Sequence, residues 1–293
     1  MFDKGSFTNL FYRHCVKGYE RMSPEAQGCL TDSVQTTQGP NGFFCGRAGQ
    51  EDLYYTFFGL LLMIVTGARI QRKKCDEKLQ AIDFTTLDLV HACAWLRADI
   101  VLRWLGIPRF MRNDLTVSLL RSFDNENVKR LRRLSDLPKT AFPQQDKDSP
   151  YSQFLLSTLH TDFGKTLQKP NLADYRLSNG LYGNVRHHSE YGVNATAAAL
   201  FLTPNDESVD ALLSLQEQDG SFKAVASAPE GDLMSTATAL FALKHCGKTP
   251  TIPVKPFLRE CFRNNGFFAA TPNDPVDDLE YTAYGLLAMG IIS

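Results

Sequence analysis

The chain has 293 residues, of which 43% are hydrophobic, and its 31 basic and 32 acidic residues give a net charge of −1. This composition allows a large core, and the balanced charge argues against binding to nucleic acid or to an anionic membrane. The seven cysteines include no CxxC pair, and the N-terminus has no basic segment followed by an apolar one. We therefore expect reduced thiols, no secretion signal and a cytoplasmic protein.

A short turn motif recurs along the chain: NGFF at 41, NGLY at 179, DGSF at 219 and NGFF at 265. Asn or Asp followed by Gly adopts a positive φ at little cost, so each motif predicts a tight turn. A loop and an apolar segment with a threonine near its start follow each turn. The Gly-to-Thr spacing is 14 residues in the first unit and 16 in the others: Gly42 to Thr56, Gly180 to Thr196, Gly220 to Thr236 and Gly266 to Thr282.

The segments on the two sides of a turn differ in polarity. Residues 29–38, 208–218 and 254–264 precede turns and carry apolar residues at helical spacing, which predicts helices with one solvated face. The segments after the turns are apolar nearly all round, which predicts buried helices. The run at 57–68 is too short to span a bilayer, so we expect no membrane span. Each unit is therefore expected to be an outer helix, a turn, a loop and an inner helix.

Residues 70–170 follow this pattern less closely. Residues 83–106 predict one or two helices, and 149–160 predict a degenerate inner helix with serine in place of threonine. The basic segments 72–78 and 130–134 predict solvated helix faces. No strand-like alternation is evident. Two degenerate helix pairs in this region would bring the total to about six.

The predicted fold class is all-α, with residues 1–293 forming one domain. Six pairs with one buried helix each close most simply as an α/α toroid, an α6/α6-type ring of inner helices around a central cavity. An open solenoid is the alternative, but it would leave the apolar inner layer in contact with water.

The repeat resembles those of protein prenyltransferase β subunits and of squalene–hopene cyclases. Residues 41–67 are especially similar to a prenyltransferase β-subunit repeat, and the likeness extends over 23–67 and 175–293. The resemblance implies an α/α toroid with an aromatic-lined cavity that binds an isoprenoid or other apolar small molecule. By the same resemblance, a helical partner subunit would be encoded elsewhere.

The prenyltransferase zinc site would map onto Asp232, Met234 and Tyr281, where the family has Asp, Cys and His. Only Asp232 matches, because a thioether and a neutral phenol are poor zinc ligands. The resemblance therefore implies an incomplete zinc site, and the cofactor stays unknown. The family's diphosphate pocket would map onto loops with few cations, of which Lys223, His187 and His188 are the candidates. A surface histidine pair is the alternative interpretation.

The cyclase resemblance implies a proton-donating Asp-x-Asp-Asp-Thr-Ala motif. Residues 232–237 keep the first Asp and the Thr-Ala, and 278–283 read Asp-x-Glu-x-Thr-Ala. Asp232, Asp278 and Glu280 are thus the candidate catalytic residues. Burial would raise the pKa of Glu280 and suit it to general acid catalysis.

Three aspartates, Asp52, Asp232 and Asp278, lie four residues before the repeat threonine. This register predicts helix N-caps. An alternative is an acidic rim at one mouth of the ring, able to bind a divalent cation, Mg²⁺ more readily than Zn²⁺. The further members of that rim would be Glu51, Glu230, Asp277 and Glu280.

Tyrosines gather near the starts of the inner helices, where core packing or a ligand cavity would explain them: Tyr54, Tyr55, Tyr191, Tyr281 and Tyr284. An aromatic lining suits an isoprenoid. We therefore expect a prenyltransferase-like or terpenoid-cyclase-like protein that binds an isoprenoid-type ligand, with catalysis left open. The alternative is a non-catalytic toroid that binds a lipid, a peptide or a protein partner.

Overall fold

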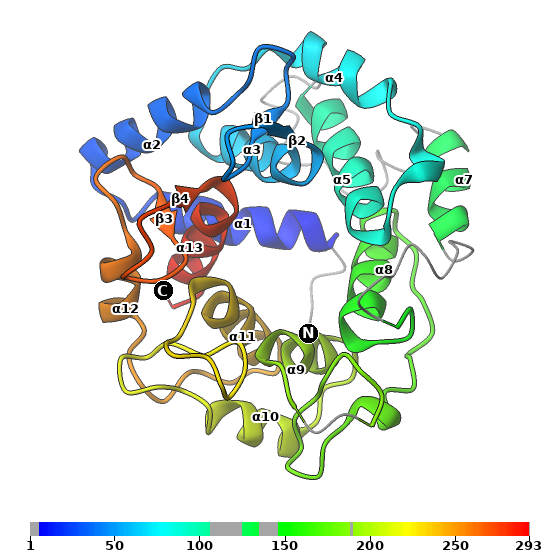
Figure 1. The fold of residues 1–293 in the computed structure, drawn as a ribbon, viewed down its shortest axis with the longest axis vertical. Coiled ribbons are helices and arrows are strands. Elements are labelled where there is room, and N and C mark those ends of the chain that lie inside the picture. The colour runs from blue at the N-terminus through cyan, green and yellow to red at the C-terminus, as the bar shows by residue number, and fades with distance from the viewer. Residues whose placement is uncertain (1–5, 106–124, 135–145, 188–189, 293) are drawn as a thin grey trace.

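The computed structural model describes residues 6–105, 125–134, 146–187 and 190–292, and these residues are mostly helical (Figure 1). The helices are α1 (Phe7–Tyr19), α2 (Pro24–Thr36), α3 (Leu53–Thr66), α4 (Arg72–Gln80), α5 (Leu89–Leu105), α7 (Asn125–Leu134), α8 (Pro150–Asp162), α9 (Val193–Leu202), α10 (Asp206–Leu213), α11 (Leu233–His245), α12 (Lys255–Cys261) and α13 (Leu279–Ile291). Short 3-10 turns occupy Phe84–Thr86 and Ala173–Tyr175.

Two very short antiparallel ladders, absent from the sequence prediction, accompany the helices. Strand β1 (Phe44–Cys45) pairs with β2 (Glu51–Asp52), and β3 (Phe268–Ala269) pairs with β4 (Asp277–Asp278). Each ladder joins the turn motif to the residues just before an inner helix. A two-residue strand is too short to show alternation in a sequence, which is why the pattern did not reveal it.

Six apolar helices contact one another in a closed succession. Helix α3 contacts α5, and the contacts continue through α8, α9, α11 and α13 back to α3 (Figure 1). Helices α2, α4, α7, α10 and α12 lie outside this succession. Before α9, the described residues supply only the 3-10 turn Ala173–Tyr175 in the outer position. None of the helices described here is both long and apolar enough to cross a membrane.

The repeat threonine bonds the turn in all four units, whether it follows the turn glycine by 14 or by 16 residues. In each unit the residue two after the glycine donates its backbone N–H to the threonine Oγ1, and that hydroxyl donates to the backbone carbonyl four residues before it. The N···O distances are 2.9, 3.0, 2.9 and 3.0 Å for Phe44–Thr56, Tyr182–Thr196, Phe222–Thr236 and Phe268–Thr282. A buried backbone N–H needs such a partner, so the threonine fixes the turn against the inner helix.

The three aspartates that precede the threonines are helix N-caps, as the register predicted. The carboxylates of Asp52, Asp232 and Asp278 accept hydrogen bonds from the backbone N–H three residues on, at 3.0, 2.8 and 2.8 Å. Each satisfies a backbone donor that the first helical turn leaves unpaired, a contribution of about 1 kcal/mol.

The inner helices begin at one end of the succession, which we call the mouth. Val193 at the start of α9 donates to the carbonyl of Ala224, in the loop leading to α11. Leu233 at the start of α11 donates in the same way to Ala270, in the loop leading to α13. The backbone N–H of Tyr151 in α8 bonds Asn184, in the loop leading to α9. Each start is thus tied to the loop of the next unit.

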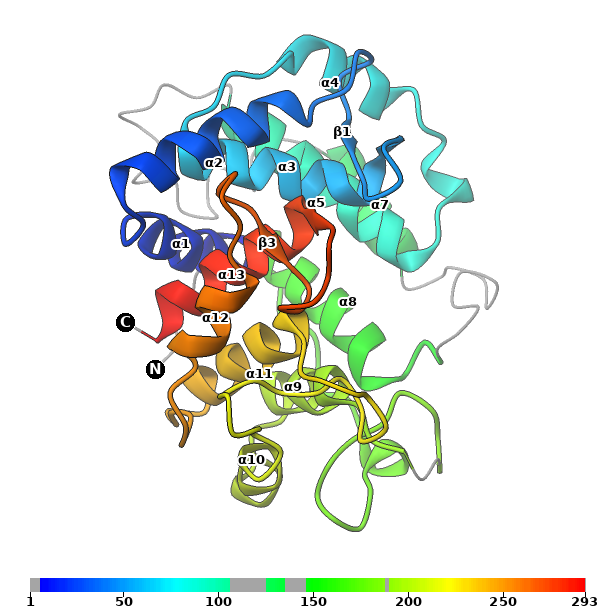
Figure 2. The ribbon, with the colours of Figure 1, turned by 60° about the vertical axis from the view of Figure 1, so that its left-hand side comes forward.

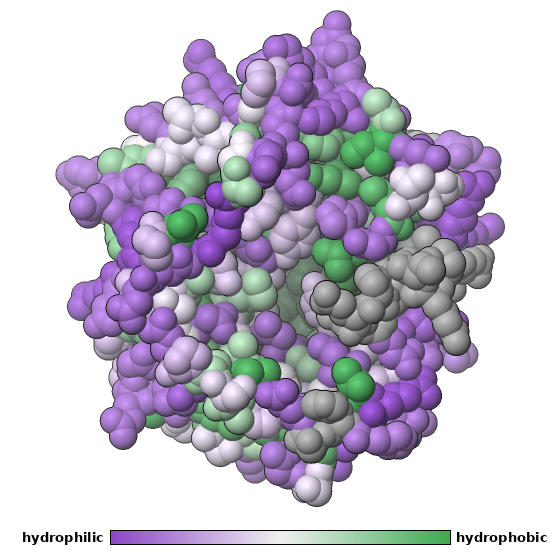
Figure 3. Space-filling model, in the orientation of Figure 1, coloured by the Kyte–Doolittle hydropathy of each residue, from purple (hydrophilic) through white to green (hydrophobic). Residues whose placement is uncertain are grey.

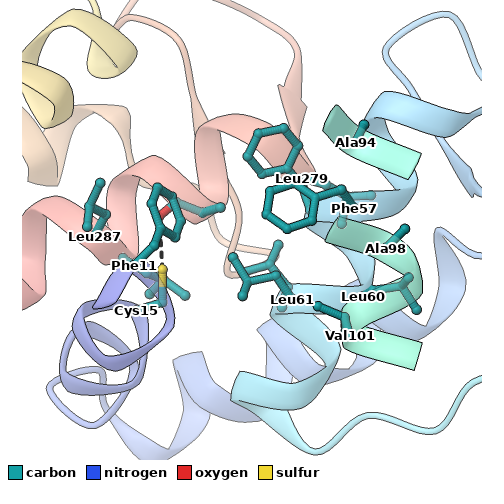
Figure 4. Close-up of a cluster of buried hydrophobic side chains, with 14 of the residues drawn as sticks. Phe11, Cys15, Phe57, Leu60, Leu61, Ala94, Ala98, Val101, Leu279 and Leu287 are labelled. Carbon is teal, nitrogen blue, oxygen red and sulfur yellow. Dashed lines mark hydrogen bonds between the residues drawn. The ribbon is translucent and has the colours of Figure 1, made fainter. Parts of the chain in front are cut away.

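Helix α1 was not anticipated from the sequence, and it lies inside the closed succession (Figures 1 and 2). It packs on α13, α3 and α8. A Cβ atom on Gly18 would lie 2.1 Å from the backbone oxygen of Leu286, so α1 and α13 meet backbone to backbone. Figure 4 shows Phe11 and Cys15 of α1 beside Leu287, with the Cys15 thiol donating to the Ala283 carbonyl at 3.5 Å. Because Asp162, the last residue of α8, binds Thr8, α1 starts at the end opposite the mouth.

Candidate functional site

A cavity of about 120 Å³ lies among the inner helices and α1, with room for about four water molecules at the roughly 30 Å³ that each occupies in the liquid. Figure 3 shows that the face seen in Figure 1 is hollowed near its centre. The lining is mainly aromatic and aliphatic: Phe7, Phe11, Tyr54, Phe57, Phe58, Val90, Cys93, Ala94, Arg97, Tyr151, Phe154, Leu155, Asn194, Ala197, Ala198, Phe201, Met234, Thr238, Phe241, Ala242, Tyr284 and Leu287.

The buried carboxyl group of Glu280 is joined to this cavity through Tyr54. Glu280 lies in the first turn of α13, is 6% exposed, and accepts a hydrogen bond from the hydroxyl of the cavity-lining Tyr54. Burial raises the pKa of Glu280 from 4.5 to about 7; Asp278 adds to the rise, whereas Tyr54 and Arg47 oppose it. A carboxyl with this pKa exchanges its proton readily at neutral pH.

The tyrosines around Glu280 remain neutral hydrogen-bond donors. Burial raises the pKa of Tyr54 and Tyr284 well above 10, and that of Tyr151 to about 12, with the Glu280 charge as a further cause in each case. All three line the cavity. The sequence prediction singled out Tyr54 and Tyr284. It missed Tyr151, which follows the helix-starting Pro150 and carries no repeat threonine to mark it.

Arg47 closes the mouth side of the site. Its Nε donates to Asp278 at 2.6 Å and its Nη2 donates to Asp274 at 2.6 Å, while its guanidinium lies 5.1 Å from the ring centre of Tyr281. Burial raises the pKa of Asp278, which Arg47 opposes. Asp278 is therefore engaged as a cap and as an ion-pair partner, and its role in the structure is to hold the start of α13.

The three positions that the prenyltransferase resemblance maps onto a zinc site are engaged in separate interactions. Asp232 caps α11, Met234 lines the cavity and takes a weak hydrogen bond from Asn194 at 3.7 Å, and Tyr281 lies under the Arg47 guanidinium. Within the described ranges no group of three or more His, Cys, Asp or Glu side chains is placed to hold a metal ion. A thioether and a phenol beside a fixed cation are poorly suited to zinc.

The carboxylates expected at the acidic rim are each occupied by a separate partner. Glu51 bonds Lys78 and Asn41, Glu230 bonds Asn273, and Asp277 bonds Asn265. Such local bonds neutralise or orient each group individually. These carboxylates therefore form separate loop and cap interactions rather than one cation site.

The remaining predicted ligand residues lie away from the cavity. Tyr191 and Lys223 share a separate surface depression, where the Lys223 ammonium lies 3.4 Å from Glu217. His187 is exposed, with φ of 54°. His188 lies outside the described residues.

Tyr55 and Tyr281 do not line the cavity either. The Tyr55 ring lies 2.8 Å from the position that a Cβ on Gly46 would take. Burial raises the pKa of Tyr55, so its phenol stays protonated at neutral pH. Burial raises the pKa of Tyr281 to about 12. Both tyrosines belong to the mouth, next to Arg47 and Asp278, rather than to the cavity wall.

Sequence reasoning missed a buried ionic group at the end opposite the mouth. Arg97 of α5, 6% exposed, lines the cavity; its Nε donates to Asp162 at 3.3 Å and its Nη2 donates to Thr158 at 2.8 Å. Asp162 also accepts from Thr8, at 2.8 Å from the backbone N–H and 2.9 Å from the hydroxyl. The sequence did contain a signal for this group, because Arg97 is a charged residue inside the largely apolar segment 89–105.

Comparison of the sequence with models of known protein families finds no match, and comparison with characterised protein sequences finds none.

Proposed function

We propose that the chain is an α/α toroid of the prenyltransferase and squalene-cyclase repeat type, whose central cavity binds an isoprenoid-type apolar ligand. The observation that carries the proposal is the closed succession of inner helices around an aromatic-lined cavity. Ring faces and edges offer a hydrocarbon chain large apolar contact, and they attract any cation formed on it. The turn–threonine unit and its capping aspartates support the repeat assignment.

Glu280 favours a second step, in which the protein processes its ligand. Tyr54 donates to Glu280 when the carboxylate is charged; when Glu280 is protonated, its O–H instead donates to the Tyr54 oxygen. In the proposed reaction, protonated Glu280 gives its proton to the Tyr54 oxygen while the Tyr54 hydroxyl passes its own proton to a ligand double bond or oxygen. The O–H bond of Glu280 breaks and a carboxylate remains. Protonation of a double bond leaves a carbocation on the ligand, and protonation of an alcohol oxygen leaves one after the oxygen departs as water. The carbocation then loses a proton from a neighbouring carbon to solvent, which forms a double bond, and Glu280 recovers a proton from solvent. The pKa of about 7 keeps a substantial protonated fraction at neutral pH.

The non-catalytic alternative uses the same cavity without this proton transfer. A lipid, a peptide or a helical partner subunit would then be the functional ligand. Cytoplasmic location and the partner subunit stay predictions from the sequence.

Equilibrium binding of radiolabelled all-trans-farnesol tests the cavity. Ala198 lines the cavity and Ala81 is exposed at the end of α4. We expect Ala198→Phe to weaken binding at least about tenfold by filling the space, and Ala81→Phe to leave it unchanged. Thermal unfolding confirms that both variants are folded. Equal binding by wild type and Ala198→Phe would reject the cavity as the site.

Product analysis then separates an enzyme from a binding protein. Wild type incubated with farnesol or geranylgeraniol in heavy water should incorporate deuterium into carbon positions if Glu280 protonates a double bond. Glu280→Gln should bind the same ligand and incorporate none. Absence of any product with wild type, despite tight binding, would support the non-catalytic alternative.

A further inference from the structure

We propose that Arg97 is the specificity-determining residue of the cavity and that it selects a ligand carrying a neutral oxygen, such as an alcohol, ether or carbonyl. This inference rests on the proposed function. It assigns a polar end to a cavity whose lining is otherwise mainly apolar.

The guanidinium of Arg97 is held in place by the protein but only partly satisfied. Its Nε bonds Asp162 and its Nη2 bonds Thr158, whereas Nη1 has no hydrogen-bond partner among the residues that the structure describes. Aromatic rings cover the group on two sides, with the carbon of the guanidinium 5.2 Å from the Phe7 ring centre and 6.0 Å from that of Phe57. The Arg97 side chain is only 7% exposed, so a donor that faces the cavity there is poorly solvated, and an acceptor from the ligand would be favoured.

The charge balance argues for a neutral acceptor. Asp162 is fully buried and already compensates the Arg97 charge. An anionic carboxylate or diphosphate on the ligand would bring a second negative charge to this pair, and the described lining residues include no cation besides Arg97. An uncompensated buried charge is strongly unfavourable. An alcohol or ether oxygen instead accepts the free N–H bonds without adding charge.

Arg97 and the Tyr54–Glu280 pair are therefore placed for different ends of one ligand. Arg97 lies in the middle of α5 and is bonded to the last turn of α8, whereas Tyr54 and Glu280 lie in the first turns of α3 and α13. An oxygen anchored on Arg97 would leave the hydrocarbon chain to run along the aromatic wall toward Tyr54.

A matched ligand series on the wild-type protein tests this assignment. Farnesol and farnesyl methyl ether carry a neutral acceptor, farnesene carries none, and farnesoate at pH 8 carries a charge. We expect the alcohol and the ether to bind about tenfold more tightly than farnesene, and farnesoate to bind no more tightly than farnesene. Equal affinity for the alcohol and farnesene, or tightest binding of farnesoate, would overturn the proposal while leaving the cavity as an isoprenoid site.

The double variant Arg97→Met/Asp162→Asn provides the residue-level control. It removes both charges together and keeps an amide oxygen for Thr8, which limits the loss of stability. We expect it to bind farnesene as wild type does and to lose the preference for farnesol. A preference that persists would assign oxygen recognition to another group. If the variant does not fold, the wild-type ligand series still decides, and failure of every ligand to bind wild type would reject the proposed function itself.

Discussion

Asp162 and Glu280 are both buried carboxyl groups bonded to residues that line the cavity, Arg97 and Tyr54, yet their surroundings differ. Asp162, at the end opposite the mouth, accepts two hydrogen bonds from Thr8 and one from Arg97. Glu280, at the mouth, accepts one from Tyr54. Burial raises the pKa of both carboxyls, and the donors around Asp162 oppose the rise there. The number and charge of the hydrogen-bond donors therefore distinguish a structural carboxylate, Asp162, from one suited to proton transfer, Glu280.

The largest expected effect on stability comes from removing the charge of Asp162, the carboxylate that accepts three hydrogen bonds. Asp162→Asn leaves the buried Arg97 without its counter-charge and should lower the free energy of unfolding by about 3–5 kcal/mol. Urea denaturation measures the loss. The control is Asp206→Asn, since the Asp206 side chain is 91% exposed and its contact with Lys248 is long, at 3.8 Å. A loss below about 1 kcal/mol for Asp162→Asn would show that Arg97 finds a replacement partner, and the contrast with Glu280 would weaken.

The next largest effect concerns Glu280, which accepts one hydrogen bond, and the pH dependence of stability that it causes. Because the pKa of Glu280 is about 7 when folded and about 4.5 when unfolded, the folded protein binds more protons between these values. The free energy of unfolding should therefore fall as pH rises from 4.5 to 7, by about 3 kcal/mol in total from this group.

Glu280→Gln removes that contribution, so the difference between the wild-type and variant curves isolates it. The other carboxyls with raised pKa values, Asp162, Asp232 and Asp278, are common to both proteins and cancel. Chemical denaturation at several pH values provides the measurement. Parallel curves would mean that Glu280 is solvated like an ordinary surface carboxyl.

A third, smaller effect tests α1, which carries Thr8 to Asp162. Gly18→Ala would place a Cβ 2.1 Å from the Leu286 oxygen and should cost about 1–3 kcal/mol, with faster amide exchange along α1. Gly28→Ala is the matched control in α2, because a Cβ there meets nothing within 4 Å. The control should be stabilising by up to about 1 kcal/mol. Equal effects of the two substitutions would show that α1 does not depend on close backbone contact.

The sequence predicted the helical class and the repeat unit because both depend on local chemistry. The turn glycines need a positive φ, and the threonines and capping aspartates satisfy backbone donors close to them in the chain. These requirements leave a fixed spacing in the sequence. Inner and outer helices likewise differ in polarity all along their length.

The cavity chemistry was only half predictable, because its polar groups meet across long sequence separations. Glu280 was found through its register beside the repeat threonine. Its partner Tyr54 and the group of Arg97, Asp162 and Thr8 are joined by contacts that no local pattern encodes. Helix α1 was missed for the same reason, since its contacts with α13 connect the two ends of the chain. The acidic rim was the alternative to N-caps at these positions, and in the described residues its carboxylates bond separate nearby partners.

The smallest predicted effect is on the pKa of Glu280 when its one hydrogen bond, from Tyr54, is removed. The Tyr54 hydroxyl is the donor that lowers the pKa of Glu280 against the effect of burial. Tyr54→Phe should therefore raise that pKa above 7, by roughly one pH unit for one lost hydrogen bond to a carboxylate. Carbon-13 NMR of labelled glutamate carboxyls follows the titration directly.

Tyr55→Phe is the control for this change, because the Tyr55 hydroxyl has no hydrogen bond to Glu280 while its ring lies next to Tyr54 at 5.8 Å between centres. An unchanged titration in Tyr54→Phe would mean that water replaces the lost hydroxyl. The Tyr54 hydroxyl would then not be the group that sets the pKa of Glu280, and the proposed proton relay through Tyr54 would lose its support. A rise confined to Tyr54→Phe would establish that one tyrosine both sets the acidity of Glu280 and connects it to the cavity. Asp162, with its three donors, would lack such sensitivity to any one hydroxyl, since the remaining donors would still favour its charged form.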